Sequence, residues 1–187
     1  MNFQSLKIHK QLLKALEKLS LIEATDVQKK IIPLIQEGKD IMVSAQTGSG
    51  KTATFLLPTL HFMLEKDAPR SSTRSLILLP TRELAIQTQA SLKQLASFTY
   101  IKSGLIIGGE AFKHQVATLR KNPEIIIATP GRLVEHIEKG TTDFNDLEIL
   151  ILDEADRMLD MGFADEMHAI SKSCNKNRQN LLFSATL

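Results

Sequence analysis

A glycine-rich segment, Ala45-Gln46-Thr47-Gly48-Ser49-Gly50-Lys51-Thr52, has the spacing of a phosphate-binding loop, with Ala45 in place of the usual first glycine. Glycines allow backbone N–H groups to turn toward phosphate oxygens without a Cβ clash. Lys51 would bind the outer phosphates of a nucleotide, and the Thr52 hydroxyl would ligate Mg²⁺. We expect the whole segment to bind the phosphates; the alternative is a glycine turn between a strand and a helix.

Carboxylates follow a later apolar run, residues 149–152, in the order Asp153-Glu154-Ala155-Asp156. A strand that delivers carboxylates to its carboxyl end completes the Mg²⁺ site of a phosphate-binding loop. We therefore expect Asp153 to hold the metal through water, and Glu154 to orient and deprotonate an attacking water. The alternative is an acidic helix start, because Asp and Glu are favoured in a first helical turn.

Three further segments, around Thr81, Gly109 and Thr129, each follow an apolar run and precede a helical pattern. Thr129 is a capping residue type, and the proline after it stands at the first helical position. Three helix N-termini on one edge of a sheet form a row of anion sites, to which Arg82 and Arg132 add charge. Ordinary helix capping is the alternative for each segment taken alone.

The elements that must position these residues follow from an alternation of short apolar runs with longer helical patterns. Continuous apolar runs are typical of strands buried on both faces, as in a parallel sheet. We therefore expect an α/β fold, a doubly wound parallel sheet with helices on both faces and ligands at the carboxyl ends of its strands. The runs occupy residues 41–43, 76–79, 105–107, 125–127, 149–152 and 181–183.

Two helices are expected before the first strand, one from the leucine spacing between Leu6 and Leu19 and one from Asp26 to about Gln36. The polar stretch at residues 66–74 contains proline and serines and is predicted to be a surface loop. We therefore expect the strands and the loops that follow them to position the candidate site.

Composition and charge limit the classes of protein that are possible. The 187 residues suit one domain, and 43% hydrophobic with 24% charged residues is ordinary globular composition. The formal net charge is +2, yet residues 1–94 carry 13 basic and 8 acidic side chains and residues 95–187 carry 10 and 13, so a local basic face for a polyanion is not excluded. A single cysteine excludes an intramolecular disulfide, and no apolar run approaches a membrane span. We expect a cytoplasmic chain.

The motifs together resemble the first RecA-like domain of a DEAD-box RNA helicase over essentially the whole chain. Residues 153–156 read D-E-A-D, the motif after which the family is named, and Ser184-Ala185-Thr186 matches motif III. The resemblance implies that Asp156, Ser184 and Thr186 couple the nucleotide site to RNA unwinding. It also implies contacts with the RNA backbone from motif Ia, the GG element and motif Ib, which are Pro80, Thr81, Arg82, Glu83, Gly108, Gly109, Thr129, Pro130, Gly131 and Arg132.

An element that reads adenine is the weakest part of this match. In the family, an upstream aromatic residue and a Gly-Phe…Pro-Thr…Gln pattern hold the base, and Phe3, Thr25 and Gln28 stand at the corresponding spacing. Thr25 and Gln28 also form a capping box, which explains them without a ligand but is compatible with a Gln28 amide that faces adenine. The remaining three positions depart from the family pattern and are Ser20, Leu21 and Ala24.

The expected function is that of the ATP-binding and RNA-binding first domain of an RNA-dependent ATPase, with Mg²⁺, that locally unwinds short duplexes. Two alternatives stay open: a non-catalytic module whose RNA or protein binding is switched by nucleotide, and a P-loop motor that acts on DNA. We expect a single RecA-like domain, with residues 1–29 as the adenine-reading element and residues 30–187 as the P-loop core.

The resemblance also implies that one component of catalysis is absent from this chain. An arginine finger comes from a second RecA-like domain in the family, and the chain ends directly after motif III. We therefore expect a monomeric fragment that binds nucleotide but hydrolyses it very slowly by itself and needs the second domain as a partner.

Overall fold

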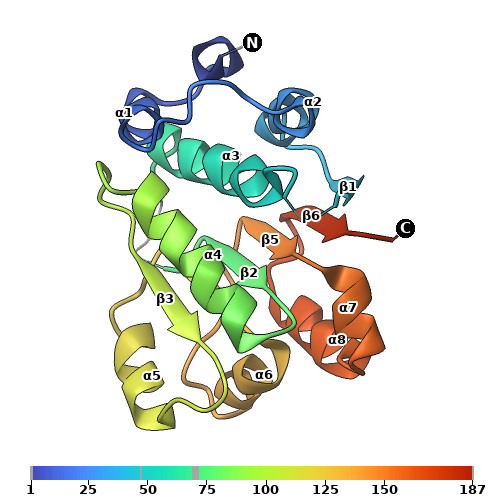
Figure 1. Cartoon of the computed structure of the whole chain (residues 1–187). Helices are drawn as coiled ribbons and strands as arrows, with labels where there is room; N and C mark the ends of the chain where they lie inside the picture. The colour runs from blue at the N-terminus through green and yellow to red at the C-terminus, as the bar shows by residue number, and fades with distance from the viewer. Residues whose placement is uncertain (1, 47, 69–71, 187) are drawn as a thin grey trace.

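The computed structural model describes residues 2–46, 48–68 and 72–186. Within them, six strands form one sheet, all of whose pairs are parallel, in the order β1-β6-β5-β2-β4-β3 (Figure 1). The expectation of a parallel α/β sheet is therefore confirmed. The strands are β1 (Ile41–Ser44), β2 (Ser75–Leu78), β3 (Ser103–Ile106), β4 (Ile125–Ala128), β5 (Ile149–Leu152) and β6 (Gln179–Ser184).

Helices precede and connect these strands, as the alternating pattern predicts. Those before the sheet and on the first connections are η1 (Phe3–Leu6), α1 (Lys10–Lys18), α2 (Asp26–Gln36), α3 (Lys51–Glu65) and α4 (Arg82–Leu95). The later ones are α5 (Phe112–Leu119), α6 (Pro130–Glu138), α7 (Ala155–Asp160) and α8 (Ala164–Ser173).

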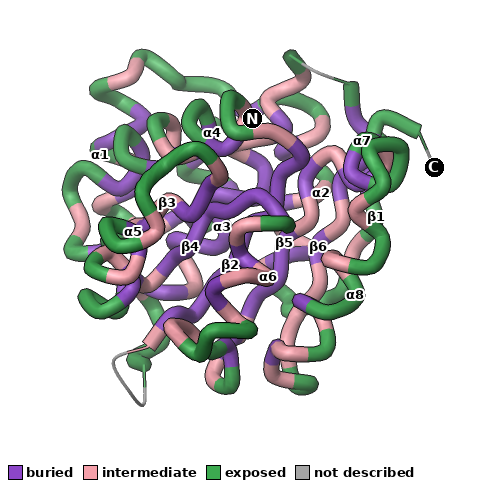
Figure 2. Tube along the Cα trace, turned by 90° about the horizontal axis from the view of Figure 1, so that it is seen from below, coloured by how far each residue is buried: buried purple, intermediate pink, exposed green. Residues whose placement is uncertain are grey.

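The sheet lies between two hydrophobic layers, and successive side chains of its central strands alternate between them. Ile77 of β2 and Ile151 of β5 pack in the cluster formed with helices α1 to α4. Their neighbours Leu76 and Leu150 pack in the cluster formed with helices α5 to α8. In Figure 2 the strands β2, β4 and β5 form the buried centre of the molecule. Helices therefore cover both faces, which makes the sheet doubly wound.

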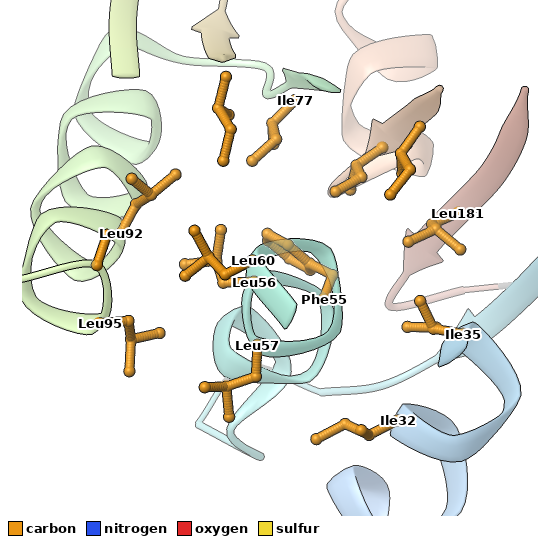
Figure 3. Packing of buried hydrophobic residues seen from close by; sticks show 14 of the residues in the cluster. Ile32, Ile35, Phe55, Leu56, Leu57, Leu60, Ile77, Leu92, Leu95 and Leu181 are labelled. Atoms are coloured by element: carbon orange, nitrogen blue, oxygen red, sulfur yellow. The ribbon is translucent and has the colours of Figure 1, made fainter. Parts of the chain in front are cut away.

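Helix α3 is the centre of the larger hydrophobic cluster. Phe55, Leu56, Leu57 and Leu60 are fully buried, so several sides of the helix are apolar (Figure 3). This pattern suits a helix that is enclosed by α2, α4 and the sheet. The Phe55 ring also packs on Phe183 of β6, with ring centroids 5.2 Å apart. This packing holds the helix that begins at Lys51 in a defined position relative to the strand ends.

Two local expectations are wrong. The leucine spacing from Leu6 to Leu19 does not mark one helix, because Lys7 adopts a left-handed backbone (φ 53°) that ends η1 before α1 begins. The 66–74 stretch is not all surface, since Arg74 is 3% exposed. Its guanidinium pairs with Glu148 at 2.6 Å and donates to the carbonyl of Lys66 at 2.8 Å, where the end of α3 leaves carbonyls without helical partners.

Candidate functional site

The six parallel strands all end at one edge of the sheet, and nearly all the residues singled out by the sequence follow those ends. We call the loops after β1, β5 and β6, residues 45–52, 153–156 and 184–186, the P-loop half of this edge. We call the loops after β2, β3 and β4, residues 80–83, 108–110 and 129–132, the arginine half. The strand order places β1, β6 and β5 together and β2, β4 and β3 together, so each half is continuous.

The P-loop half begins with a turn that depends on glycine. Gly48 and Gly50 have φ values of 83° and 80°, a backbone that other residues adopt only with strain. Helix α3 begins directly afterwards at Lys51, and no side chain of the described residues caps its N-terminus. The first-turn N–H groups are therefore available to an anion, which the helix dipole also favours. Thr47 lies outside the described residues.

Ala45, the departure from the usual glycine, has a structural explanation. Its N–H donates to the carbonyl of Ser184 at 3.0 Å, which extends the pairing of β1 with β6 by one residue. Its side chain is 6% exposed and belongs to the larger hydrophobic cluster. The loop is closed on its other side by Ser49, whose hydroxyl donates to the carbonyl of Gln46 at 2.8 Å.

The start of α2 is bound to the P-loop. Thr25 and Gln28 form the expected capping box. The Thr25 hydroxyl also donates to the Ser49 carbonyl at 3.0 Å, and the Gln28 amide nitrogen donates to the Gly50 carbonyl at 3.1 Å. A Cβ on Gly50 would lie 2.7 Å from that nitrogen, so only glycine allows this close contact. One N–H and one lone pair of the Gln28 amide are left for a ligand.

Phe3 occupies a different environment from that expected of an adenine-stacking residue. It is 4% exposed and packs in the hydrophobic cluster of helices α1 to α4. Its ring therefore supports the N-terminal element from inside instead of presenting an open face to a base.

The Lys51 ammonium, which is expected to bind phosphates, lies close to the carboxylates of Asp153 and Glu154. Lys51 Nζ lies 2.9 Å from Asp153 Oδ1 and 3.8 Å from Glu154 Oε1. Lys51 and Asp153 are 7% and 4% exposed. Burial raises the pKa of the Asp153 carboxyl above its usual value, and the nearby Lys51 ammonium partly opposes that shift. The arrangement is a buried ion pair at the carboxyl edge of the sheet.

Glu154 has an unusual backbone for a non-glycine residue. Its φ of 55° and ψ of 48° place it in the left-handed region, which costs about 1–2 kcal/mol. The Asp153 carboxylate accepts the Glu154 N–H at 2.9 Å and so holds this conformation. Strained backbone of this kind is concentrated at functional sites.

A cavity of about 430 Å³ opens at the P-loop. Gly50, Lys51, Thr52, Asp153 and Glu154 are among the residues that line it. No hydrogen bond within the described residues uses the Thr52 hydroxyl, and no group of three or more His, Cys, Asp or Glu side chains there has metal-binding geometry. One hydroxyl and one carboxylate, completed by phosphate oxygens and water, form a donor set that suits Mg²⁺.

The end of β6 is joined to the carboxylate loop. Asp156 accepts hydrogen bonds from the Thr186 hydroxyl at 2.9 Å and from its backbone N–H at 3.2 Å. These bonds lower the pKa of the Asp156 carboxyl. Ser184 donates instead to the Thr186 carbonyl at 2.6 Å. Strands β5 and β6 therefore share a hydrogen-bonded link at their ends.

The arginine half is built around the loop after β3. Arg82, in the first turn of α4, donates from Nη1 to the Gly108 carbonyl at 3.1 Å. Gly109 has a φ of 79°, and a Cβ there would overlap the Arg82 guanidinium. On the other side, Arg132 donates from Nη1 to the Glu110 carbonyl at 2.8 Å. Two arginines from different helices are thus fixed by the carbonyls of one loop.

The helix starts of this half differ from one another. The Thr81 hydroxyl accepts the Leu84 N–H at 3.3 Å and caps α4, with Pro80 before it and Glu83 exposed in the first turn. Thr129 precedes Pro130 and Gly131 in α6 but, within the described chain, accepts no capping bond on its side chain. Gly109 is not a cap, because α5 begins only at Phe112. Two helix N-termini, instead of three, directly adjoin the expected segments.

Two residues that pack behind the arginine half were not singled out by the sequence motifs. Gln115 of α5 and His136 of α6 are 4% and 0% exposed, and they are hydrogen-bonded to each other. No motif contains them. The sequence could have revealed them only as a glutamine and a histidine at helical positions that face an apolar layer. The chain has five histidines with no metal-binding spacing, so nothing distinguished His136 from the other four.

Comparisons with known proteins agree with this geometry. Residues 25–187 match the DEAD/DEAH box helicase family. The chain is 54% identical over 186 residues to a probable ATP-dependent RNA helicase ddx27 of Dictyostelium discoideum, and 47% identical over 189 residues to the ATP-dependent RNA helicase DRS1 of Saccharomyces cerevisiae. It covers 24% and 25% of those two proteins, while 99% and 100% of the chain is aligned.

A solved structure is similar over the whole chain. The crystal structure of a DEAD box protein from the hyperthermophile Methanococcus jannaschii superposes with a TM-score of 0.93 at 40% sequence identity. The match covers 100% of this chain and 50% of that protein's chain. The chain described here thus spans about a quarter of the length of its curated relatives and half of the solved one.

Proposed function

Because this chain belongs to the DEAD/DEAH box helicase family, we propose that it is the ATP-binding first domain of an RNA-dependent ATPase that separates short RNA duplexes. The observation that carries the proposal is the buried cluster of Lys51, Asp153 and Glu154 directly below the glycine turn, at the edge where parallel strands bind ligands. A structural turn alone would not require two nearly unexposed opposite charges, since burying them is costly.

The P-loop half has the parts that phosphoryl transfer requires. The free N–H groups at the start of α3 would bind the phosphates, and Lys51 would move its ammonium from Asp153 to their outer oxygens. Thr52 and Asp153 would hold Mg²⁺, which when bound neutralises charge on the transferred phosphoryl group. Glu154 would accept a proton from the attacking water. Thr25 and Gln28 support the loop and would leave one amide N–H and one lone pair for adenine.

The arginine half would bind the RNA backbone. Arg82 and Arg132 present guanidinium groups beside the helix starts at Thr81 and Thr129, a combination that favours phosphate. Neither the loops nor the arginines offer a pattern that would read bases, so we expect little sequence specificity. Both relatives are named as RNA helicases, which favours RNA over DNA as the polymer.

The remaining parts of the proposal concern the whole protein. The relatives are about four times longer than this chain, which leaves room for the second RecA-like domain that supplies an arginine finger. The link from Asp156 to Thr186 would transmit the state of the nucleotide site toward that domain. Among the described residues no helix is long and apolar enough to cross a membrane. A cytoplasmic protein whose first domain is monomeric by itself completes the proposal.

The test is ATP turnover by the full-length protein with RNA and with DNA of the same length and sequence, at one salt concentration. We expect RNA to stimulate turnover by at least about tenfold more than DNA, while this chain alone stays near the unstimulated rate. Equal stimulation by DNA would support the DNA motor instead. Nucleotide-dependent RNA binding without any turnover would support the switched binding module.

A further inference from the structure

Arg132 is held from several directions by its own chain. Its Nη1 donates to the Glu110 carbonyl at 2.8 Å and to Gln115 Oε1 at 3.1 Å, and its Nε lies 3.1 Å from Glu135 Oε2. The planar guanidinium is therefore fixed in orientation. No hydrogen bond of the described residues uses Nη2, so the edge of the fork that carries this nitrogen is left for an anion.

The Gln115 amide has one possible orientation. Its Nε2 donates to the Ile107 carbonyl at 2.6 Å, and rotating the amide by half a turn would place two oxygens against each other there. Oε1 must therefore face Arg132, where it accepts a guanidinium N–H. Because Ile107 directly follows β3, this amide ties Arg132 to the base of the loop after that strand. Gln115 is 4% exposed and does not reach the surface edge itself.

His136 fixes the other side of the same amide oxygen. Its Nε2 lies 3.0 Å from Gln115 Oε1, and since that oxygen only accepts, Nε2 carries a proton. Its Nδ1 lies 2.7 Å from the Thr141 hydroxyl oxygen, which also lies 3.0 Å from the His136 carbonyl, so in the neutral Nε2–H form the single hydroxyl proton is directed to Nδ1. Burial lowers the pKa of His136, and the nearby Arg132 guanidinium lowers it further, so the neutral Nε2–H form is favoured at pH 7.

The ring that makes this bond is itself immobile. His136 is fully buried and stacks on Phe112 of α5, with ring centroids 4.0 Å apart and planes inclined by 6°. The Lys139 ammonium lies 4.3 Å from the centroid of the Phe112 ring. Helices α5 and α6 are thus joined by a stacked pair and by the Gln115 bridge, which gives the arginine support from both helices.

From this network we propose that Gln115 is a positioning residue that, held by His136, aims the Nη2 edge of Arg132 at the nucleic acid backbone. The inference rests on the proposed function, since it takes Arg132 to be a backbone contact. A buried glutamine that only satisfied the Ile107 carbonyl would not need its oxygen placed between two donors on α6. The oxygen between Arg132 and His136 is what distinguishes positioning from a purely structural role.

Two substitutions of Gln115 separate the two roles. Gln115→Met keeps the shape but removes the whole amide, whereas Gln115→Glu keeps an oxygen that accepts from Arg132 and His136, places its second oxygen against the Ile107 carbonyl and adds a negative charge beside Arg132. Both variants should unfold at lower denaturant concentration than the parent, because both leave that buried carbonyl without its partner. Gln89→Met is the matched control: this glutamine on α4 donates to the Ser103 hydroxyl, away from the arginines.

In the full-length protein we expect Gln115→Met to weaken binding of a single-stranded RNA by about tenfold and to leave ATP affinity within twofold. The slope of log K against log salt should fall by about 0.7, the loss of one phosphate contact. Gln89→Met should keep the parent's RNA affinity and salt slope, whereas Gln115→Glu should lower both, because its carboxylate offsets the Arg132 charge while holding the guanidinium in place. No loss of RNA affinity in Gln115→Met, or an equal loss in Gln89→Met, would overturn the positioning role.

Two further measurements separate this inference from the proposed function. If Arg132→Met leaves RNA affinity unchanged, the RNA contact assigned to Arg132 is wrong, and the aiming role of Gln115 is overturned with it. If Arg132→Met weakens RNA binding but Gln115→Met does not, only the inference about Gln115 is overturned. In this chain, NMR of the Arg132 Nε–H should show one ordered signal in the parent and Gln115→Glu, and an averaged signal in Gln115→Met.

Discussion

The two halves of the sheet edge hold their cations in different ways. In the P-loop half, Lys51 is paired with the carboxylates of Asp153 and Glu154. In the arginine half, the Nη1 atoms of Arg82 and Arg132 donate to neutral carbonyl and amide oxygens, and Arg132 is also paired through Nε with the partly exposed carboxylate of Glu135. Carbonyl and amide oxygens orient a guanidinium without cancelling its charge, whereas a carboxylate offsets the charge that it holds. The buried Lys51 ammonium must therefore leave its carboxylates to bind phosphate, whereas both arginines are already oriented for it.

The largest expected effect is confined to the P-loop half. Glu154→Gln removes the proton acceptor and keeps the shape, so ATP turnover by the full-length protein should fall by at least about 100-fold. Affinity for ATP and for RNA should each stay within threefold, because Lys51 keeps Asp153 as its partner. Steady-state turnover and equilibrium binding measure these quantities.

The matched control for this change is Glu37→Gln, at an exposed glutamate that pairs with Lys39. It should behave as the parent does. Turnover by Glu154→Gln within threefold of the parent would show that the Glu154 carboxylate is not the base. The assignment of ATP hydrolysis to the P-loop half would then lose its main support.

The second effect is confined to the arginine half. Gly109→Ala places a Cβ against the Arg82 guanidinium and strains a backbone with φ 79°, so RNA affinity should fall by about tenfold with ATP affinity unchanged. Gly162→Ala provides the control, because Gly162 has a φ of 84° and nothing within 4 Å of an added Cβ. A loss of RNA affinity in both variants would mean that global strain, and not displacement of Arg82, is responsible.

A third comparison uses two threonines that cap helices in different halves. Thr25 caps α2 and Thr81 caps α4, and each accepts an N–H at 3.3 Å. Alanine at either position should lower the free energy of unfolding by about 1 kcal/mol. Thr25→Ala should also weaken ATP binding, because it loses the bond to the Ser49 carbonyl, while Thr81→Ala should weaken only RNA binding. Denaturant unfolding and binding titrations distinguish these outcomes; an effect of each variant on both ligands would contradict the division.

The sequence was sufficient for the sheet and for the positions of its ends. Uninterrupted apolar runs such as residues 125–127 and 149–152 are dictated by burial on both faces, and β4 and β5 occupy them. Motif residues such as Lys51 and Arg132 then reach one edge because parallel strands share a direction. The pairing of Lys51 with Asp153 follows from that placement, since the P-loop and the carboxylates follow β1 and β5, which end at the same edge with β6 between them.

What the sequence could not supply were contacts that depend on tertiary packing. The burial of Arg74 arises from unpaired carbonyls at the end of α3, which no local pattern in a polar loop reveals. The link between Gln115 and His136 joins helices whose side chains meet only after both pack on the sheet. Phe3 likewise turns inward because α1 and α2 offer it an apolar site. Long-range contacts of this kind carry no periodic signal.

The smallest effect is a difference in the sign of the pH dependence of stability. His136 has a lowered pKa in the folded chain, so the unfolded chain binds more protons below its reference pKa of 6.5. The contribution of His136 to the free energy of unfolding is present above pH 6.5 and is lost as the pH falls. Asp153 has a raised pKa, so its contribution is present below its reference pKa of 3.8 and is lost as the pH rises above that value. The free energy of unfolding therefore rises with pH through His136 and falls with pH through Asp153.

Urea unfolding of this chain between pH 4 and 7.5 measures both slopes. His136→Asn should flatten the rise in unfolding free energy toward pH 6.5, and Asp153→Asn should make the net rise with pH steeper by removing the opposing group. His168→Asn, at an exposed position on α8, is the control and should leave the profile unchanged. If His136→Asn left the slope intact, the pKa of the ring would be the same in the folded and unfolded chains. Burial and the Arg132 guanidinium would then not favour the neutral ring, and the support of Gln115 by a neutral His136 would lose its electrostatic basis.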